Sequence, residues 1–256
     1  MPPLPLIDEN EKLETVNENI KLIRKKDGLT FGTDAYLLAA YVSRAPAALA
    51  VDRGSGTGIL PLLLLARDKI KQAVAVEVQE SFCALITRNA ALNGMSERLS
   101  ALFTDVRSLP SGALAAECAD LVISNPPYMT VDSGKPNASD AKFIARHEVC
   151  GDISDFCRAA SALLKYGGRF YCVYRPDRLV DLLDAMRRHR LEPKRMTLVH
   201  ATAASIPSML LVEAKKGASP SLILTRPLIL TDADGRQTED TARIYETCSF
   251  EDFLKR

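Results

Sequence analysis

The chain has 256 residues, of which 47% are apolar and 25% charged, an ordinary composition for a globular protein with a sizeable core. Its 33 basic and 32 acidic side chains leave a net charge of +1, which excludes polyanion binding through bulk charge alone. The longest apolar run, residues 59–66, is too short to cross a bilayer, and no secretory signal is visible, so we expect a cytoplasmic protein without a membrane partner.

The pattern along the chain predicts an α/β fold. Thr33 is expected to cap a helix that runs through Tyr41. Strands are then predicted at 48–52, 72–78, 99–104, 119–124 and 169–174, and helices at 57–67, 80–93, 153–166 and 176–189. This alternation favours a doubly wound, mainly parallel sheet. Two adjacent strands at 195–200 and 208–214 predict an antiparallel C-terminal hairpin at the sheet edge.

The organisation of the chain is expected to be simple. We predict a single domain over residues 1–256, in which residues 1–45 form an N-terminal extension packed on the rest. Residues 129–142 contain Gly134, Pro136 and Asn137 and carry the one long loop signal of the chain. Because this segment follows the motif with the strongest chemical signal, we expect it to be a mobile substrate loop.

A glycine turn follows the strand that ends at Asp52. It reads Gly54-Ser55-Gly56-Thr57-Gly58 and opens the next helix. A dinucleotide-binding fingerprint would require glycine at position 59, where an isoleucine stands. The observed spacing instead suits the amino-acid end of S-adenosylmethionine, although a tight strand-to-helix turn would also use it. Asp52, Gly54, Ser55, Gly56 and Gly58 are therefore candidate cofactor-binding residues.

Two further acidic residues stand at predicted strand ends. Glu77 ends the second strand, where a carboxylate can accept both ribose hydroxyls of a nucleoside-containing cofactor. Asp105 ends the third strand and could accept a hydrogen bond from an adenine amine. A helix cap or a solvated turn is an equally good interpretation of Asp105 alone.

The most specific motif is Asn125-Pro126-Pro127-Tyr128, which directly follows an apolar strand. Two prolines end the strand and stiffen the turn. The Asn125 amide oxygen and the Pro126 carbonyl can accept the two N–H groups of a planar amine, and Tyr128 offers a face for stacking. Such an amine is a poor nucleophile, so two acceptors that draw it toward tetrahedral geometry assist attack on a sulfonium methyl. The motif therefore predicts an amino-methyltransferase.

Several outer motifs make the resemblance to a known family closer. They are Phe31–Leu38, Ala145-Arg146-His147-Glu148, Glu192–Arg195, Pro227-Leu228 and Asp234-Gly235. Over about residues 15–247 the chain resembles the class I, S-adenosylmethionine-dependent methyltransferases of the bacterial tRNA1(Val) adenine-N6-methyltransferase family.

This resemblance implies methylation of N6 of the adenosine beside the anticodon of a tRNA. It places Asn125 to Tyr128 around the target amine, and it places around the cofactor Thr33, Asp52, Gly54, Gly56, Glu77 and Asp105. One departure is Arg53, where the family usually carries an apolar residue. Its side chain is expected either to point outward or to weaken cofactor binding.

Basic residues suggest where RNA phosphates could be contacted. Clusters occur at 21–26, 187–195 and 215–216, although each could equally be a solvated face. Lys25 and Lys26 are the chosen candidates for RNA contact. Arg146 and His147 are candidates either to order the substrate loop or to touch the substrate. The partner is expected to be tRNA, with no obligate protein partner.

Two other functions stay open at this point. A glutamine side-chain amide is also planar and conjugated, so the Asn125 motif would serve a protein glutamine-amide N-methyltransferase equally well. A non-catalytic cofactor-binding or RNA-binding module is the third interpretation, and it gains some weight from Arg53. We predict no metal site, because the three histidines lack ligand spacing and no Cys-x-x-Cys pair occurs.

Overall fold

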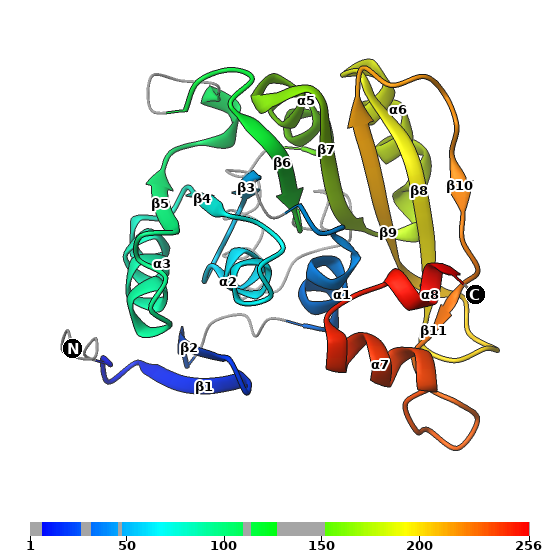
Figure 1. The fold of residues 1–256 in the computed structure, drawn as a ribbon, viewed down its shortest axis with the longest axis horizontal. Coiled ribbons are helices and arrows are strands. Elements are labelled where there is room, and N and C mark those ends of the chain that lie inside the picture. The colour runs from blue at the N-terminus through cyan, green and yellow to red at the C-terminus, as the bar shows by residue number, and fades with distance from the viewer. Residues whose placement is uncertain (1–6, 27–31, 46–47, 110–113, 127–151, 256) are drawn as a thin grey trace, which may run out of the picture.

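A nine-stranded mixed sheet forms the centre of the molecule (Figure 1). The computed structural model describes residues 7–26, 32–45, 48–109, 114–126 and 152–255. The strand order is β10-β8-β9-β7-β6-β3-β4-β5, and β11 also pairs with β8.

The elements have the following bounds. The strands are β1 (Glu11–Asn17), β2 (Ile20–Lys25), β3 (Leu49–Arg53), β4 (Gln72–Glu77), β5 (Leu99–Phe103), β6 (Ala119–Ser124), β7 (Leu164–Tyr174), β8 (Leu191–His200), β9 (Pro207–Lys216), β10 (Ile223–Leu224) and β11 (Leu228–Ile229). The helices are α1 (Thr33–Tyr41), α2 (Ile59–Ala66), α3 (Glu80–Leu92), α5 (Ile153–Leu163), α6 (Leu179–Arg188), α7 (Glu239–Thr247) and α8 (Glu251–Lys255). Two short 3-10 turns are η1 (Val106–Ser108) and η2 (Pro176–Arg178).

The sheet is parallel over its first half and gains an antiparallel hairpin at its C-terminal side. Strands β5, β4, β3, β6 and β7 pair in parallel in that order. Strand β9 pairs antiparallel with β8, as the sequence predicted, and it also pairs antiparallel with β7. The hairpin is not the outermost element, because the short strands β10 and β11 pair in parallel with β8. The predicted doubly wound architecture is confirmed.

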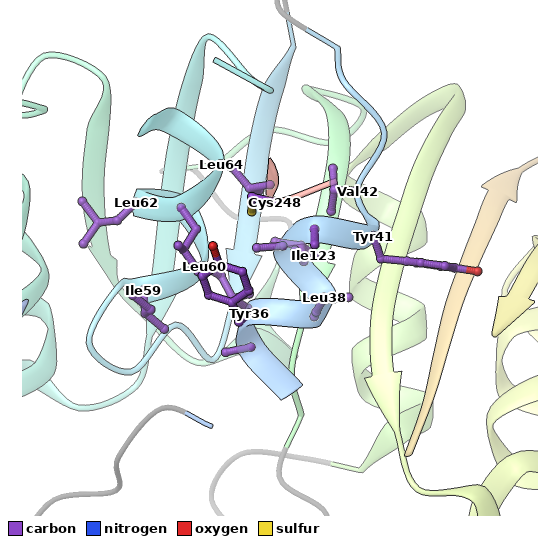
Figure 2. Close-up of a cluster of buried hydrophobic side chains, with 14 of the residues drawn as sticks. Tyr36, Leu38, Tyr41, Val42, Ile59, Leu60, Leu62, Leu64, Ile123 and Cys248 are labelled. Atoms are coloured by element: carbon purple, nitrogen blue, oxygen red, sulfur yellow. The ribbon is translucent and has the colours of Figure 1, made fainter. Parts of the chain in front are cut away.

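Helices cover both faces of the sheet and create two cores. On one face, side chains from α1, α2 and α3 pack together with residues of α7 and α8. On the other face, α5 and α6 pack against the sheet. Figure 2 shows Leu38 and Tyr36 of α1 close to Leu60 and Leu64 of α2, with Ile123 of β6 beside them. Since α2 is apolar around its whole circumference, this helix is buried as the sequence implies.

Two predicted helix boundaries on the C-terminal side differ from the structure, and strand β8 begins at Leu191 rather than at residue 195. The helix expected to reach residue 166 ends at Leu163, and Leu164 already belongs to β7. Gly168 serves the strand rather than ending the helix: a Cβ there would lie 2.9 Å from the Lys165 carbonyl and 3.2 Å from the Asp120 carbonyl. Pro176 opens a 3-10 turn, and α6 itself begins at Leu179.

The N-terminal part of the chain forms a separate two-stranded sheet. Strands β1 and β2 pair antiparallel, and β2 packs against α3 (Figure 1). The predicted cap of α1 is wrong, because Thr33 is the first helical residue and the N-cap is Gly32. A Cβ at position 32 would lie 2.7 Å from Asp34 Oδ1, so a side chain there would require the Asp34 carboxylate to shift.

The expected substrate loop at 129–142 lies outside the described residues. Within the described segments, no helix has the length and apolarity needed to cross a membrane. The same segments contain no group of three potential metal-binding side chains.

Candidate functional site

The candidate site lies where three neighbouring parallel strands end. Arg53 of β3 pairs with Val76 of β4 and with Ser124 of β6, so the residues after these positions emerge at one edge of the sheet. The Ser124 hydroxyl donates to the Arg53 carbonyl at 2.9 Å and ties the two strand ends together. Ligands of open α/β sheets bind at this carboxyl edge, where the strand order reverses.

The glycine turn adopts the left-handed backbone that its sequence suggests. Gly54, Gly56 and Gly58 have φ angles of 73°, 56° and 82°. A Cβ on Gly56 would have no neighbour within 4 Å, so the backbone faces open space at this point. Such a turn lets a ligand approach the backbone closely and presents N–H groups at the start of α2.

Asp52 is the charged group placed deepest in this turn. Its side chain is 1% exposed, and Oδ2 accepts a hydrogen bond from the Ser55 hydroxyl. Among the described residues, Oδ1 has no hydrogen-bond partner. Burial raises the pKa of Asp52 to about 7. A buried carboxylate oxygen of this kind would be satisfied by a cationic donor such as an ammonium group.

Glu77 braces the turn from the neighbouring strand. Its Oε2 accepts from the Gly56 N–H at 2.9 Å, and its Oε1 accepts from the backbone of Val78 and Gln79 at 2.9 and 3.0 Å. A carboxylate has about four acceptor positions, of which three are used by the protein itself. Two ribose hydroxyls would therefore have to share the carboxylate with the Gly56 N–H or replace it.

Asp105 lies one strand further along the same edge. The Thr104 N–H donates to the Glu77 carbonyl at 3.1 Å, which brings the end of β5 beside β4. Arg107 holds the Asp105 carboxylate with hydrogen bonds of 2.5–3.1 Å from its guanidinium, and this contact lowers the pKa of Asp105. An adenine amine at this place would meet a carboxylate that is already oriented.

Arg53 does not point outward. Its side chain is 0% exposed and passes under the glycine turn to α5, where its guanidinium lies 4.8 Å from the Phe156 ring centroid. Its two terminal nitrogens donate to the backbone carbonyls of Phe156 and Asp155. Burial lowers the pKa of Arg53 to about 9. The arginine therefore connects the glycine turn to the first turn of α5.

The orientation of Asn125 is fixed by Asp34, a residue for which the sequence predicted no role. The Asn125 amide nitrogen donates to Asp34 Oδ2 at 2.8 Å. Asp34 lies in the first turn of α1, and its Oδ1 accepts from the Ala35 N–H at 2.8 Å. Because a carboxylate only accepts hydrogen bonds, the amide must turn its nitrogen toward Asp34 and its oxygen away from it. The available signal was the position of Asp34 in the segment Phe31–Leu38.

The other residues that the sequence predicts for the site are not all brought together by the described part of the structure. Thr33 is exposed and adjacent to Asp34, and Pro126 is buried directly after Asn125. The Lys25 ammonium donates to the Ser81 hydroxyl at 3.0 Å and lies 5.0 Å from the Phe82 ring centroid. Lys26 is exposed at the end of the hairpin. The residues outside the described segments are Pro127, Tyr128, Arg146 and His147.

The geometry fits a cofactor that carries both an amino acid and a nucleoside. Asp52 offers an acceptor for an ammonium, and the open backbone at Gly56 offers room beside it. Glu77 and Asp105 continue the same edge in strand order. Asn125 stands at the end of β6, on the other side of β3. The arrangement can therefore hold a methyl donor along one strand edge and an amine acceptor at its end.

Comparison with known proteins gives a consistent result. The sequence profile described as the methyltransferase small domain matches residues 26–188. A tRNA1(Val) (adenine(37)-N6)-methyltransferase from Porphyromonas gingivalis is 29% identical over 223 residues, 84% of this chain and 86% of that protein. A protein of the same name from Tolumonas auensis is 32% identical over 64% of this chain and 70% of its own length.

The fold has a solved counterpart as well. A crystal structure of a predicted O-methyltransferase from Agrobacterium tumefaciens superposes with a TM-score of 0.70 at 25% sequence identity. It covers 85% of this chain and 97% of the other chain.

Proposed function

Because this chain belongs to the methyltransferase small-domain family and is an S-adenosylmethionine-dependent N-methyltransferase, we propose that it methylates the exocyclic N6 amine of an adenosine in tRNA, beside the anticodon. The observation that carries the amine-methylating part of this proposal is the orientation of Asn125 by Asp34 at the end of β6. The names of the curated relatives support the choice of tRNA and of adenine N6.

The residues of the glycine turn and its neighbours would hold the cofactor. Asp52 would accept from the ammonium of the methionine part, and Glu77 would accept from the ribose. Asp105 would accept from the adenine amine, and Thr33 would line the site from the start of α1. When bound, S-adenosylmethionine supplies a methyl group on a positively charged sulfur.

Asn125 and Pro126 would act on the acceptor amine. The Asn125 amide oxygen and the Pro126 carbonyl each accept one N–H of the amine, which directs the nitrogen lone pair toward the methyl group. Asp34 holds the amide in the orientation that presents oxygen, so the amine meets a fixed acceptor. Tyr128 would stack on the base, and no strong general base is needed. The methyl group would transfer in line, with S-adenosylhomocysteine as the leaving group and one proton of the amine released to water.

The substrate side of the proposal rests on sequence resemblance and charge. Lys25 and Lys26 would contact tRNA phosphates, while Arg146 and His147 would order the loop at 129–142 or touch the RNA. We further propose that residues 1–256 act as one cytoplasmic domain, with residues 1–45 as an extension of it, and without an obligate protein partner.

A protein glutamine-amide methyltransferase is the competing function. The contact between Asn125 and Asp34 would serve an amide nitrogen equally well, so the geometry alone does not separate the two substrates. The curated relatives favour the tRNA substrate, because their names state adenine-N6 methylation of a tRNA.

The deciding experiment offers both substrates to the purified enzyme. Labelled S-adenosylmethionine is added to total tRNA and to total protein from a strain that lacks this enzyme, and the labelled tRNA is digested to nucleosides. We expect the label as N6-methyladenosine in tRNA. Label in protein alone would replace the proposal by glutamine methylation. The adenosine beside the anticodon is then tested by sequencing the labelled tRNA fragment.

A further inference from the structure

One buried asparagine of α3 connects two parts of the molecule that are distant in sequence. Asn89 is 0% exposed. Its Oδ1 accepts from the Ile23 N–H at 2.7 Å, and its Nδ2 donates to the Ile23 carbonyl at 3.0 Å. The same Nδ2 donates to the Thr57 carbonyl at 3.0 Å. Asn89 thus holds the N-terminal hairpin on one side and the glycine turn on the other.

A second asparagine repeats half of this arrangement. Asn93 accepts from the Lys21 N–H at 2.9 Å and donates to the Lys21 carbonyl at 2.7 Å. Four residues of a helix advance about 6 Å along its axis, and two residues of a strand advance about 6.6 Å. Two helix side chains four positions apart can therefore contact two strand residues that are two positions apart. Helix α3 therefore offers β2 two amides in place of a third strand.

Only Asn89 extends this docking to the glycine turn. Thr57 lies between Gly56 and Gly58, both of which have positive φ angles. Helix α3 also packs on the turn through Ile86, which would lie 3.3 Å from a Cβ on Gly58. The peptide that carries the Thr57 carbonyl can rotate only if its bond to Asn89 is broken. The conformation of the turn therefore depends on the same amide that docks the hairpin.

We propose that Asn89 is a positioning residue that couples docking of the β1–β2 hairpin to binding of the cofactor in the glycine turn. The inference rests on the assignment of that turn to S-adenosylmethionine. Coupling between two sites is reciprocal, so a bound cofactor must reduce opening of the hairpin by the same factor by which a docked hairpin raises cofactor affinity. The Asn89 side chain contacts the backbone of the glycine turn and has no described contact with Asn125. Asn89 therefore acts on cofactor binding rather than on the transfer step.

The test uses S-adenosylhomocysteine and the full chain. In the wild-type protein, we expect saturating ligand to slow hydrogen exchange of the peptide that covers residues 20–25 by about tenfold. Asn89→Ala should raise the Kd for the ligand by about tenfold, raise the KM for S-adenosylmethionine and leave kcat nearly unchanged. In this variant the ligand should no longer slow exchange of the hairpin.

Asn93→Ala provides the matched control. It removes the two equivalent hydrogen bonds to Lys21 of β2, together with a bond to the Asn89 carbonyl, without touching the turn. Exchange of the hairpin should become faster in this variant, but the ligand should still slow it.

Two results would overturn the inference. Ligand binding that leaves hairpin exchange unchanged in the wild-type protein would remove the coupling while keeping the cofactor assignment. The same conclusion would follow from an Asn89→Ala protein that binds ligand with wild-type affinity. If S-adenosylhomocysteine does not bind the wild-type protein at all, the cofactor assignment fails together with the inference. The wild-type exchange measurement decides the question even if Asn89→Ala does not fold.

Discussion

At the scale of single residues, the carboxylate of Asp34 decides which atom Asn125 offers to a substrate. In Asp34→Asn, the new amide can either accept from or donate to Asn125, so the orientation of Asn125 is no longer enforced. We expect kcat to fall by about 100-fold, because small losses of alignment at a reacting centre are costly. The cofactor Kd should stay within about twofold, because the contact lies outside the glycine turn. Single-turnover methyl transfer and calorimetric titration measure the two quantities.

The control for this prediction is the partner residue. Asn125→Ala should abolish turnover while leaving cofactor binding nearly intact. If Asp34 works only through Asn125, the double variant should be no worse than Asn125→Ala alone, since residues that act as a unit are not additive. Full turnover by Asp34→Asn would contradict the positioning role.

The buried carboxylate of Asp52 predicts a pH-dependent cofactor affinity. Its pKa is raised to about 7, above the ordinary value of 3.8, so the free protein favours the neutral form. This preference stabilises the fold below pH 3.8 and is lost as the pH rises through 7. A cationic ammonium favours the ionised form, so binding should strengthen as the pH rises toward 7, by at most about tenfold per pH unit.

Calorimetric titration with S-adenosylhomocysteine between pH 5.5 and 7 checks this prediction. The α-amino group of the ligand stays protonated throughout this window, because α-amino groups lose their proton only at about pH 7.7–8.0 or above. Asp52→Asn should bind more weakly at pH 7, and its affinity should change little over the range. An equally steep pH profile in Asp52→Asn would show that another group titrates.

The sequence pointed to polar residues at three strand ends, but not to the distant side chains that hold this part of the molecule in place. Asp52, Glu77 and Asn125 each end an apolar strand, and that local pattern is visible without a structure. The partner of Asn125 lies 91 residues away, and Asn89 reaches the hairpin across 66 residues. Such contacts depend on how distant elements pack against one another in space. The hydrophobic periodicity of the chain therefore does not predict them.

At the scale of secondary-structure elements, helix α1 depends on a lysine in the connection between α2 and β4. The Lys69 ammonium donates to the carbonyls of Ala39, Ala40 and Val42 at 2.7–2.9 Å. These carbonyls belong to the last turn of α1 and its cap, where helical partners are lacking. Lys69 is nearly fully buried, and burial lowers its pKa to about 8. A favourable interaction with the helix dipole accompanies these bonds.

Lys69→Met should therefore lower the free energy of unfolding by about 3 kcal/mol, because it leaves buried carbonyls without donors. The pKa of Lys69 is lowered from 10.5 to about 8, so the wild-type protein should gain stability as the pH rises from 8 to 10.5. This gain should be absent in Lys69→Met. Urea unfolding at several pH values measures both effects, and the exposed Lys71→Met serves as the control. A loss below about 1 kcal/mol would contradict the capping role.

Arg53 is also a buried cation, but we expect its replacement to change the free energy of unfolding less than replacement of Lys69. Its Nε has no partner among the described residues, and the carbonyls that it reaches belong to α5, whose own amides also bond to carbonyls in the helix. Replacing a buried charge by an apolar side chain of similar length is often neutral or stabilising. The free energy of unfolding of Arg53→Met should therefore lie within about 1 kcal/mol of the wild-type value, and its cofactor affinity should be unchanged. Urea unfolding and ligand titration test it, and a loss above about 3 kcal/mol would show that the guanidinium is required.

Element types were predictable because hydrophobic runs and breakers alternate along the chain, whereas two boundaries were not. Gly167 and Gly168 looked like a helix stop, but Leu164 enters β7 because it pairs with Ala119 of β6. Gly168 is required by close backbone approach across the sheet. The strand therefore overrides a local helical preference, as tertiary packing commonly does.

At the scale of the whole molecule, the near-zero net charge means that RNA must be bound by local groups. The cluster at 187–195 is less available than its sequence suggests. Arg195 bonds to Glu213 at 2.8 Å and packs on the Tyr41 ring, while Arg188 pairs with Asp184. In the N-terminal hairpin, Arg24 pairs with Glu14 and is buried. Lys25 and Lys26 therefore remain the proposed contacts to RNA phosphates. Lys25 is half-buried and Lys26 is exposed.

Charge reversal of the pair gives the test at this scale. Lys25→Glu with Lys26→Glu should weaken tRNA binding by at least about tenfold near 0.1 M salt, because two phosphate contacts become repulsive. The slope of log K against log salt should become shallower by about 0.7–0.9 for each lost contact. The Kd for S-adenosylhomocysteine should change less than in Asn89→Ala, because Lys25 contacts Ser81 and Phe82 of α3 but neither lysine has a described contact with the glycine turn. Lys12→Glu, on β1 of the same hairpin, is the control for a general change of charge. If the double variant binds tRNA as the wild type does, the hairpin does not contact the RNA and the phosphate contacts must lie elsewhere on the molecule.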